Sequence, residues 1–313
     1  MNPLLSEFAR NITSQCGEDG ILAEIFNRLG TKSKVCVEFG AWDGKVCSNT
    51  WTLWHDQGWK AYLIECHPER FLDLSRTVAD FPEVTPLQSL VEPAGEKSID
   101  NILRGAGCPE EIDLLSVDID GDEYYILDSI RWLKPRVIVV EYNATIPPHL
   151  DLVQKRGGNI GSSMAAMVRL ADSKGFSLVA CTQSNLILVD AREFPKLKIP
   201  PQTIEAVFPR EALTCVISSY DGNLHLSRRP LHVVRLDGLT SENLRRASRE
   251  PLRHLFDDNR IIPIRVFAER DIIFKPAGRR RSPPGLADYG GAAVRKVLNV
   301  WRGWIQGRQK GKG

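Results

Sequence analysis

The stretch VCVEFGAWDG places a glutamate, Glu38, two residues before the first of two closely spaced glycines, Gly40 and Gly44. A dinucleotide-binding loop would read GxGxxG here, and a carboxylate beside it would repel a pyrophosphate. A carboxylate suits an ammonium or sulfonium group instead. Glu65, which ends the next apolar run AYLIEC, lies 21 residues after Gly44 (65 − 44). An acid at about that distance typically accepts hydrogen bonds from a ribose diol.

These residues together predict a cationic nucleoside ligand that carries no phosphate. S-adenosylmethionine has this chemistry, because its sulfonium and ammonium groups are cationic. The two glycines alone would be explained equally well by an ordinary tight turn between a strand and a helix. The prediction therefore depends on Glu38 and Glu65.

Two later apolar runs also end in acidic or amide side chains. IDLLSVDID ends at Asp118 and Asp120, and RVIVVEYN ends at Glu141 and Asn143. Residues two apart on a strand face the same side, and adjacent parallel strands end side by side, so these groups should crowd one patch. Repulsion among them would be relieved by a shared proton, a basic partner or a hard divalent cation such as Mg²⁺.

Each form of relief implies a different chemistry. A cation bound by Asp118, Asp120, Glu141 and Asn143 would orient an acceptor hydroxyl and lower its pKa. Without a cation, Asp118 or Asp120 would be the general base, with His149 as a second candidate. The acids that follow, at 122 and 123, are explained as a turn and the start of a helix.

Strands and helices alternate along the chain around these residues. Strand-like runs are expected at 35–40, 61–66, 84–90, 112–120 and 136–143, and helix-like segments at 21–30, 48–57, 68–79, 96–105, 122–132 and 162–175. This alternation predicts an α/β fold with a doubly wound, mostly parallel sheet. The runs 176–183 and 185–191 are separated by one residue and should form an antiparallel hairpin at one end of it.

Several ordered blocks resemble the FkbM-type S-adenosylmethionine-dependent methyltransferases over about residues 13–190. The blocks are SQCGEDGILAEIF, VEFGAWDGKVCSNT, GWKAYLIECHPERF, DLLSVDIDGDEYYIL and PRVIVVEYNATIPP. The resemblance implies a Rossmann-like sheet of seven strands whose last strand is antiparallel. It also implies that Glu38, Gly40 and Gly44 hold the methionine part of the donor, and Glu65 the ribose.

The resemblance adds further candidates for the donor site. The segment that contains Gln15 and Asp19 would fold over the donor pocket, although both residues are also explained as part of a capping cluster. Asp43 and Asn49 lie in and just after the glycine turn. The common methyltransferase pattern has a third glycine midway in this turn, where this chain has Trp42, so the loop would be wider or the indole would line the pocket.

The function implied by the resemblance is methyl transfer to a hydroxyl of a saccharide or a small secondary metabolite. One alternative is a non-catalytic, methyltransferase-like module that binds a ligand or partner and is tethered by its basic tail. Another is an NAD-dependent oxidoreductase, against which the missing GxGxxG counts. The sequence names neither the acceptor nor an oligomeric state.

The composition of the 313 residues, 42% hydrophobic and 26% charged, is that of a globular protein. We expect a methyltransferase domain at 1–192, an extension or cap at 193–278 and a basic segment at 279–313. No apolar run is long enough to span a membrane and no signal peptide is recognised. Seven scattered cysteines without a CxxC pair indicate a reducing, cytoplasmic location.

The basic segment holds nine Lys or Arg residues against one acid, so any attraction to polyanions belongs to it. Its residues 292–306 predict an amphipathic helix with tryptophans on the apolar side. Such a helix would either dock on protein or contact the anionic inner face of a membrane peripherally. No specific nucleic-acid partner is predicted.

Overall fold

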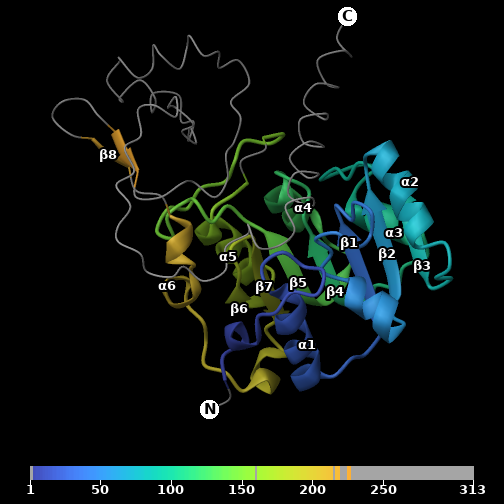
Figure 1. The fold of residues 1–313 in the computed structure, drawn as a ribbon, viewed down its shortest axis with the longest axis horizontal. Coiled ribbons are helices and arrows are strands. Elements are labelled where there is room, and N and C mark those ends of the chain that lie inside the picture. The colour runs from blue at the N-terminus through green and yellow to red at the C-terminus, as the bar shows by residue number, and fades with distance from the viewer. Residues whose placement is uncertain (1–2, 159–160, 214–215, 219–223, 227–313) are drawn as a thin grey trace, which may run out of the picture. The chain divides into compact units, whose positions relative to one another are not determined.

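Seven strands form one sheet in the computed structural model of the chain, which describes residues 3–158, 161–213, 216–218 and 224–226 (Figure 1). The strands are β1 (Val35–Phe39), β2 (Lys60–Glu65), β3 (Val84–Gln88), β4 (Glu111–Val117), β5 (Lys134–Glu141), β6 (Phe176–Cys181) and β7 (Asn185–Asp190). Each begins and ends within a few residues of its expected run. The apolar runs are therefore strands, as predicted.

The strand order is β3-β2-β1-β4-β5-β7-β6. Strands β1 to β5 pair in parallel, whereas β7 is antiparallel to both of its neighbours, β5 and β6. This order, with the last strand reversed, is that of the class I methyltransferase fold. The predicted doubly wound sheet and its terminal antiparallel hairpin are confirmed. The order reverses beside β1, where open α/β sheets bind their ligands.

Helices cover both faces of this sheet (Figure 1). One face packs against α3 (Ile99–Gly105), α4 (Glu123–Ser129) and α5 (Met164–Ser173). The other packs against α1 (Glu18–Leu29) and α2 (Pro68–Thr77). In β1, Val37 joins the first core and Cys36 the second, because successive side chains of a strand point to opposite faces.

The segment expected as a helix at 48–57 is different in the structure. Thr52–Asp56 forms one short π-helix (η2), and residues 48–50 before it form a turn rather than a helix. In that turn the hydroxyl groups of Ser48 and Thr50 donate to the Glu38 carboxylate. A side chain of the neighbouring strand therefore holds this backbone, which local helical periodicity does not reveal.

The chain beyond the sheet also packs on it. The described elements are η1 (Leu5–Phe8), before the sheet, and η3 (Phe194–Leu197), α6 (Ile204–Val207), η4 (Arg210–Ala212), β8 (Val216–Ser218) and β9 (Leu224–Leu226). Leu197 joins the α1-side core, and Phe208 joins the other. Strands β8 and β9 form an antiparallel pair. The domain boundaries at 192 and 278 stay predictions.

The basic segment 279–313 and its amphipathic helix lie outside the described residues. Among the described residues, no helix is both long enough and apolar enough to cross a bilayer.

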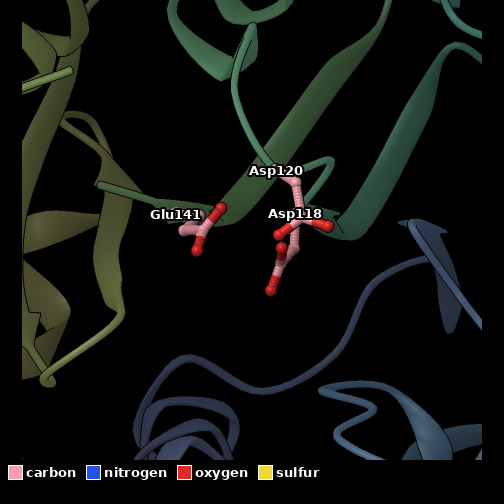
Figure 2. A group of neighbouring side chains, drawn as sticks. All are labelled: Asp118, Asp120 and Glu141. Carbon is pink, nitrogen blue, oxygen red and sulfur yellow. The ribbon is translucent and has the colours of Figure 1, made fainter. Parts of the chain in front are cut away.

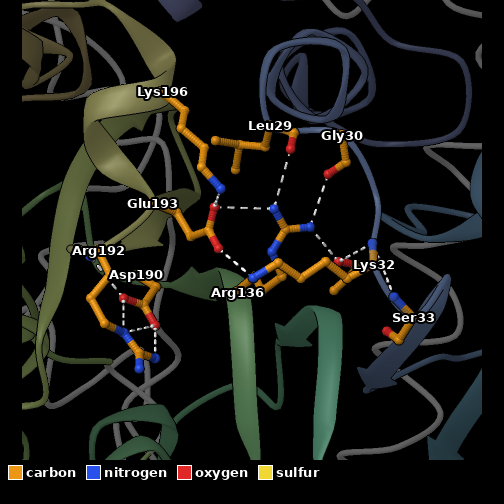
Figure 3. A network of polar contacts seen from close by, with 10 residues as sticks. Leu29, Gly30, Lys32, Ser33, Arg136, Asp190, Arg192, Glu193 and Lys196 are labelled. Carbon is orange, nitrogen blue, oxygen red and sulfur yellow. Dashed lines mark hydrogen bonds and ion pairs between the residues drawn. The ribbon is translucent and has the colours of Figure 1, made fainter.

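A network of charged groups ties α1 to the amino ends of β4 and β5 (Figure 3). Arg136 donates to Asp113 at 2.6 Å, to the Gly30 carbonyl at 2.9 Å and to Glu193 at 3.3 Å. Glu193 also accepts from Lys32 at 2.6 Å. The carboxylates at this edge of the sheet are thus paired with cations.

Candidate functional site

The opposite edge, at the carboxyl ends of the parallel strands, collects carboxylates on the face covered by α1. Residues of β1, β2, β4 and β5 that face α1 occur at every second position, and they include Cys36, Leu63, Leu114 and Val139. The same alternation brings Glu38, Glu65, Asp118 and Glu141 to that face. One strand period therefore explains why acids separated by about a hundred residues meet.

The turn after β1 passes very close to the end of β4, and Gly40 makes this approach feasible. A Cβ atom on Gly40 would lie 1.8 Å from the Asp118 carbonyl oxygen, and its φ is +71°. Trp42 and Cys47, which are not glycines, also have positive φ angles, of 51° and 62°. Backbone held in this region outside glycine is typical of functional sites.

Glu38 is buried, with 3% of its surface exposed, and is fully engaged by its own chain. It accepts hydrogen bonds at 2.7 Å from Ser48 Oγ, Thr50 Oγ1 and the Asn49 N–H. Burial raises the pKa of Glu38, and these three bonds oppose the increase. The carboxylate thus fixes the 48–50 turn, rather than pointing unpaired into a crevice.

Glu65 is also buried, at 6% exposure, and is placed at the end of β2 as expected. Its Oε2 accepts from the Trp42 N–H at 3.0 Å and its Oε1 from the His67 N–H at 2.7 Å. The Trp42 indole is covered by Arg70, whose guanidinium carbon lies 3.6 Å from the ring centroid. One face of the indole is thus taken by a cation rather than lining an open pocket.

Asp19 lies in the first turn of α1, at the same edge. Its Oδ2 accepts from the N–H groups of residues 12, 13 and 14 at 2.7–2.8 Å, and from the Ser14 hydroxyl at 2.8 Å. Its Oδ1 is buried and has no donor among the described residues. The capping role is thus filled by one oxygen alone. Gln15, in the loop that Asp19 holds, is exposed.

Glu18 anchors this start of α1 to the rest of the edge. Its side chain is fully buried and accepts from Thr182 at 2.6 Å and from the Asn185 side chain at 3.1 Å. The start of α1, and Asp19 with it, is therefore fixed to the β6–β7 hairpin.

Asp118, Asp120 and Glu141 form a cluster at the ends of β4 and β5, and Figure 2 shows their carboxyl groups converging. One oxygen of each lies within 4.8 Å of the others. Asp118 and Glu141 are half-buried, and Asp120 is exposed. Asp120 has a positive φ of 59°, which turns the chain after β4. These oxygens have the number and type to hold a hard cation or share protons.

The electrostatics of the cluster favour bound protons. Burial, followed by repulsion from Asp120 and Glu123, raises the pKa of Asp118 to about 8. Burial, followed by repulsion from Asp118 and Glu123, raises the pKa of Glu141 well above its usual range. A hydrogen bond joins the carboxyl groups of Asp118 and Glu141, with Glu141 as the donor. The pair therefore loses its first proton near pH 8, from Asp118, and above that pH the two carboxyl groups share the proton that stays on Glu141.

Glu123 supports this cluster in a way that the sequence analysis missed. Its buried Oε1 accepts from the N–H groups of Ile119 at 3.0 Å and Gly121 at 2.8 Å, which flank Asp120. Burial raises the pKa of Glu123 to about 7. The carboxylate thus holds the strained Asp120 backbone, and a helix-starting acid two residues after a glycine was the only signal for it.

The other predicted site residues lie apart from the cluster or are engaged elsewhere. Asn143 Oδ1 accepts from the Thr145 N–H at 2.8 Å, inside its own turn. Asp43 Oδ1 likewise accepts from backbone N–H groups, at 2.8 and 2.9 Å. Asn49 donates to Ser116 at 3.1 Å and is buried. His149 is exposed on the segment between β5 and α5 and does not belong to the cluster of Asp118, Asp120 and Glu141.

Comparison with known proteins gives likeness in fold only. No family model and no curated protein matches the chain. The solved CurJ carbon methyltransferase is 11% identical over 55% of this chain and 52% of that one, with a TM-score of 0.41. The chain thus spans about half of its length.

Two further structures are similar. A SAM-dependent methyltransferase from Aquifex aeolicus is 11% identical over 53% of this chain and 86% of that one, with a TM-score of 0.34. Precorrin-6y C5,15-methyltransferase from Geobacter metallireducens is 16% identical over 58% and 92%, with a TM-score of 0.36. The fold assignment rests on the strand order and directions, and the activity has to be argued from the site.

Proposed function

We propose that the chain transfers a methyl group from S-adenosylmethionine to a hydroxyl of a saccharide or small secondary metabolite. The observation that carries the proposal is the Asp19 carboxylate, whose buried Oδ1 has no donor among the described residues. A buried acceptor left unpaired is costly, so this oxygen calls for a ligand that donates a hydrogen bond. The α-ammonium of the methyl donor would supply it.

The surrounding charges support a cationic ligand over a phosphate-bearing one. Among the residues that the structure describes, Asp19, Glu38 and Glu65 have no Lys or Arg within ion-pairing distance. We assign Glu65 to the ribose diol, since each of its oxygens retains a lone pair beside the backbone N–H it accepts. Glu38 supports this site by holding the 48–50 turn.

We assign the chemical step to the proton-sharing acids. In an in-line displacement the acceptor oxygen forms a bond to the methyl carbon as the bond from that carbon to sulfur breaks. The hydroxyl proton passes to a carboxylate, and the products are a methyl ether and S-adenosylhomocysteine. Asp118, with a pKa of about 8, suits a general base that is ionised from about pH 8 upward, with Glu141 holding the shared proton.

A divalent cation at Asp118, Asp120 and Glu141 is the alternative way to activate the hydroxyl. Asn143 would join such a site only by giving up its bonds to Thr145. Methyl transfer that is unchanged by a chelator favours the shared proton. Activity that is lost with chelator and restored by Mg²⁺ favours the cation.

The test of the proposed function is product formation by the full chain. Incubation with cell extract and donor carrying a labelled methyl group should give a labelled small molecule, detected by mass spectrometry. Asp118→Asn should abolish the label while retaining donor affinity. A donor that binds without any labelled product, across saccharide and metabolite fractions, would favour the non-catalytic binding module instead.

A further inference from the structure

A cavity of about 220 Å³ opens at the edge of the sheet opposite the acidic cluster. It lies between the amino end of β5, the amino end of β6 and the carboxyl end of β7. Its floor is apolar and includes Leu127, Leu133 and Phe176. A cavity of about 150 Å³ holds benzene, so this one has room for an aromatic ring with a small head group.

The rim of the cavity carries four cations and a single carboxylate, Asp190. Asp190 is already paired, because Arg192 Nε bonds both of its oxygens, at 2.9 and 3.1 Å (Figure 3). Lys134, a second rim cation, pairs with Glu110 at 2.5 Å. The charges of Arg192 and Lys134 are therefore compensated within the protein.

The two remaining cations, Arg131 and Lys174, have only carbonyl partners. Arg131 Nη1 donates to the Ile130 carbonyl at 3.0 Å, and Lys174 Nζ donates to the same carbonyl at 3.1 Å. Within the described part of the chain, neither side chain forms an ion pair. These bonds cap the end of α4, but they use only one of the three donors of the Lys174 ammonium.

Acids lie near this rim, but they do not outweigh burial and the neighbouring cation at Lys174. Lys174 is half-buried, and burial, followed by repulsion from Arg131, lowers its pKa. Asp128 and Asp100 act in the opposite direction but with less effect. An anion seated in the cavity would satisfy both cations, and an apolar body would cover the floor.

We propose that this cavity is a second ligand site, which binds a small organic anion with an apolar body and a carboxylate or phosphate head. The head group would contact Lys174 and Arg131, and the ring or short chain would lie against Phe176. The site is separate from the acidic cluster, because it lies at the other end of the strands. Its occupancy does not depend on the proposed methyl transfer.

Calorimetry and ligand-observed NMR on the full chain test this site with four probes. Benzoate and phenyl phosphate carry both features, benzyl alcohol lacks the charge, and inorganic phosphate lacks the apolar body. At least one of the first two should bind saturably, and benzyl alcohol and inorganic phosphate much more weakly. Whether benzoate or phenyl phosphate binds better identifies the head group.

Variants then locate the binding. Lys174→Gln should weaken the better probe by about tenfold, the effect expected for one charge-assisted hydrogen bond. Lys155→Gln, at an exposed lysine outside the cavity lining, should leave affinity unchanged. Arg131→Gln serves as a second variant if Lys174→Gln melts early. No binding of either anion at millimolar concentration, equal binding of benzyl alcohol, or wild-type affinity in both cavity variants would overturn the proposal.

Discussion

Glu38 and Asp118 lie on the same face of neighbouring strands, yet their carboxyl groups are held in opposite ways. Glu38 receives three short hydrogen bonds from the 48–50 turn. Asp118 faces other acids, and its pKa is raised to about 8. At the scale of single residues, the first group is thus suited to fixing structure and the second to exchanging a proton.

The raised pKa values of the acidic cluster predict how stability depends on pH. The folded state holds protons that the unfolded chain releases near pH 4, so the contribution of these groups is complete below that pH and is lost as pH rises through about 8. The loss should approach about 1.4 kcal/mol per pH unit for each titrating group. Urea unfolding from pH 6 to pH 9 measures it.

The matched variant for this prediction is Glu141→Gln, which removes one acid of the pair while keeping its shape. Its stability should fall less steeply than that of the wild-type protein over the same pH range. Parallel curves for the two proteins would show that the pair does not share a proton.

Glu123 is a positioning residue in this account, because it acts on Asp120 through the backbone on either side. Glu123→Ala should lower methyl transfer by about 100-fold, as a misplacement of about 1 Å does. Glu123→Gln retains an acceptor oxygen and should recover most of the rate. A shift in the pH–rate profile of Glu123→Gln, by loss of its charge, separates this role from a purely structural one. An equal loss in both variants, with an unchanged profile, would contradict it.

At the scale of elements, the hydrogen bonds from residues 48–50 to Glu38 explain why this segment is a turn and not part of a helix. Glu38→Ala should destabilise the fold by about 3 kcal/mol, since it leaves several buried donors unpaired. Asp43→Ala, which removes the acceptor of two backbone N–H groups in the adjacent turn, should cost about 1 kcal/mol. Chemical denaturation compares the two. A cost for Glu38→Ala no greater than that for Asp43→Ala would show that the 48–50 turn holds itself.

The elements of the sheet could be predicted from sequence because a short apolar run is typical of a strand that is buried on both faces. VCVEF and RVIVVE are buried on both faces, and the single residue between the runs 176–183 and 185–191 left room only for a hairpin. Strand alternation also placed Asp118 beside Glu141. Those features depend on local pattern and on general rules of sheet topology.

The state of individual side chains at the site could not be predicted in the same way. The saturation of Glu38, the unpaired Oδ1 of Asp19 and the role of Glu123 depend on hydrogen bonds made in three dimensions. The turn that engages Asn143 is more local, since its partner is two residues away. Residue types indicate which groups can form hydrogen bonds, but they do not indicate which donors the fold brings within reach of a given carboxylate.

At the scale of the whole sheet, the carboxyl groups at the two edges are stabilised in opposite ways. Those at the amino edge are paired with cations, and those of the acidic cluster hold protons. At the amino edge, although burial opposes it, Lys196, Lys32 and Arg136 lower the pKa of Glu193 to about 2. The contribution of Glu193 is present above its ordinary pKa, near 4.5, and is lost as pH falls through about 2. Because the stabilisation from the acidic cluster already declines above about pH 4, the two effects together place maximum stability near pH 4.5.

The network at the amino edge predicts a large effect of its central cation. Arg136→Met should destabilise the fold by about 3–5 kcal/mol, because Asp113 and Glu193 would stay buried without it. Lys196→Met removes a more exposed partner of the same Glu193 and should cost less than about 1 kcal/mol. Denaturant midpoints measure both. Equal costs would show that Arg136 is not central to the network.

The central claim is that the acidic edge binds a cationic nucleoside through Asp19 and Glu65. The most direct test is calorimetric titration of the full chain with S-adenosylmethionine and with NAD, repeated for Asp19→Asn. We predict one-to-one binding of S-adenosylmethionine, no binding of NAD, and at least about a tenfold loss of affinity in Asp19→Asn. Binding of NAD in place of the methyl donor, or undiminished affinity in a folded Asp19→Asn variant, would contradict the account.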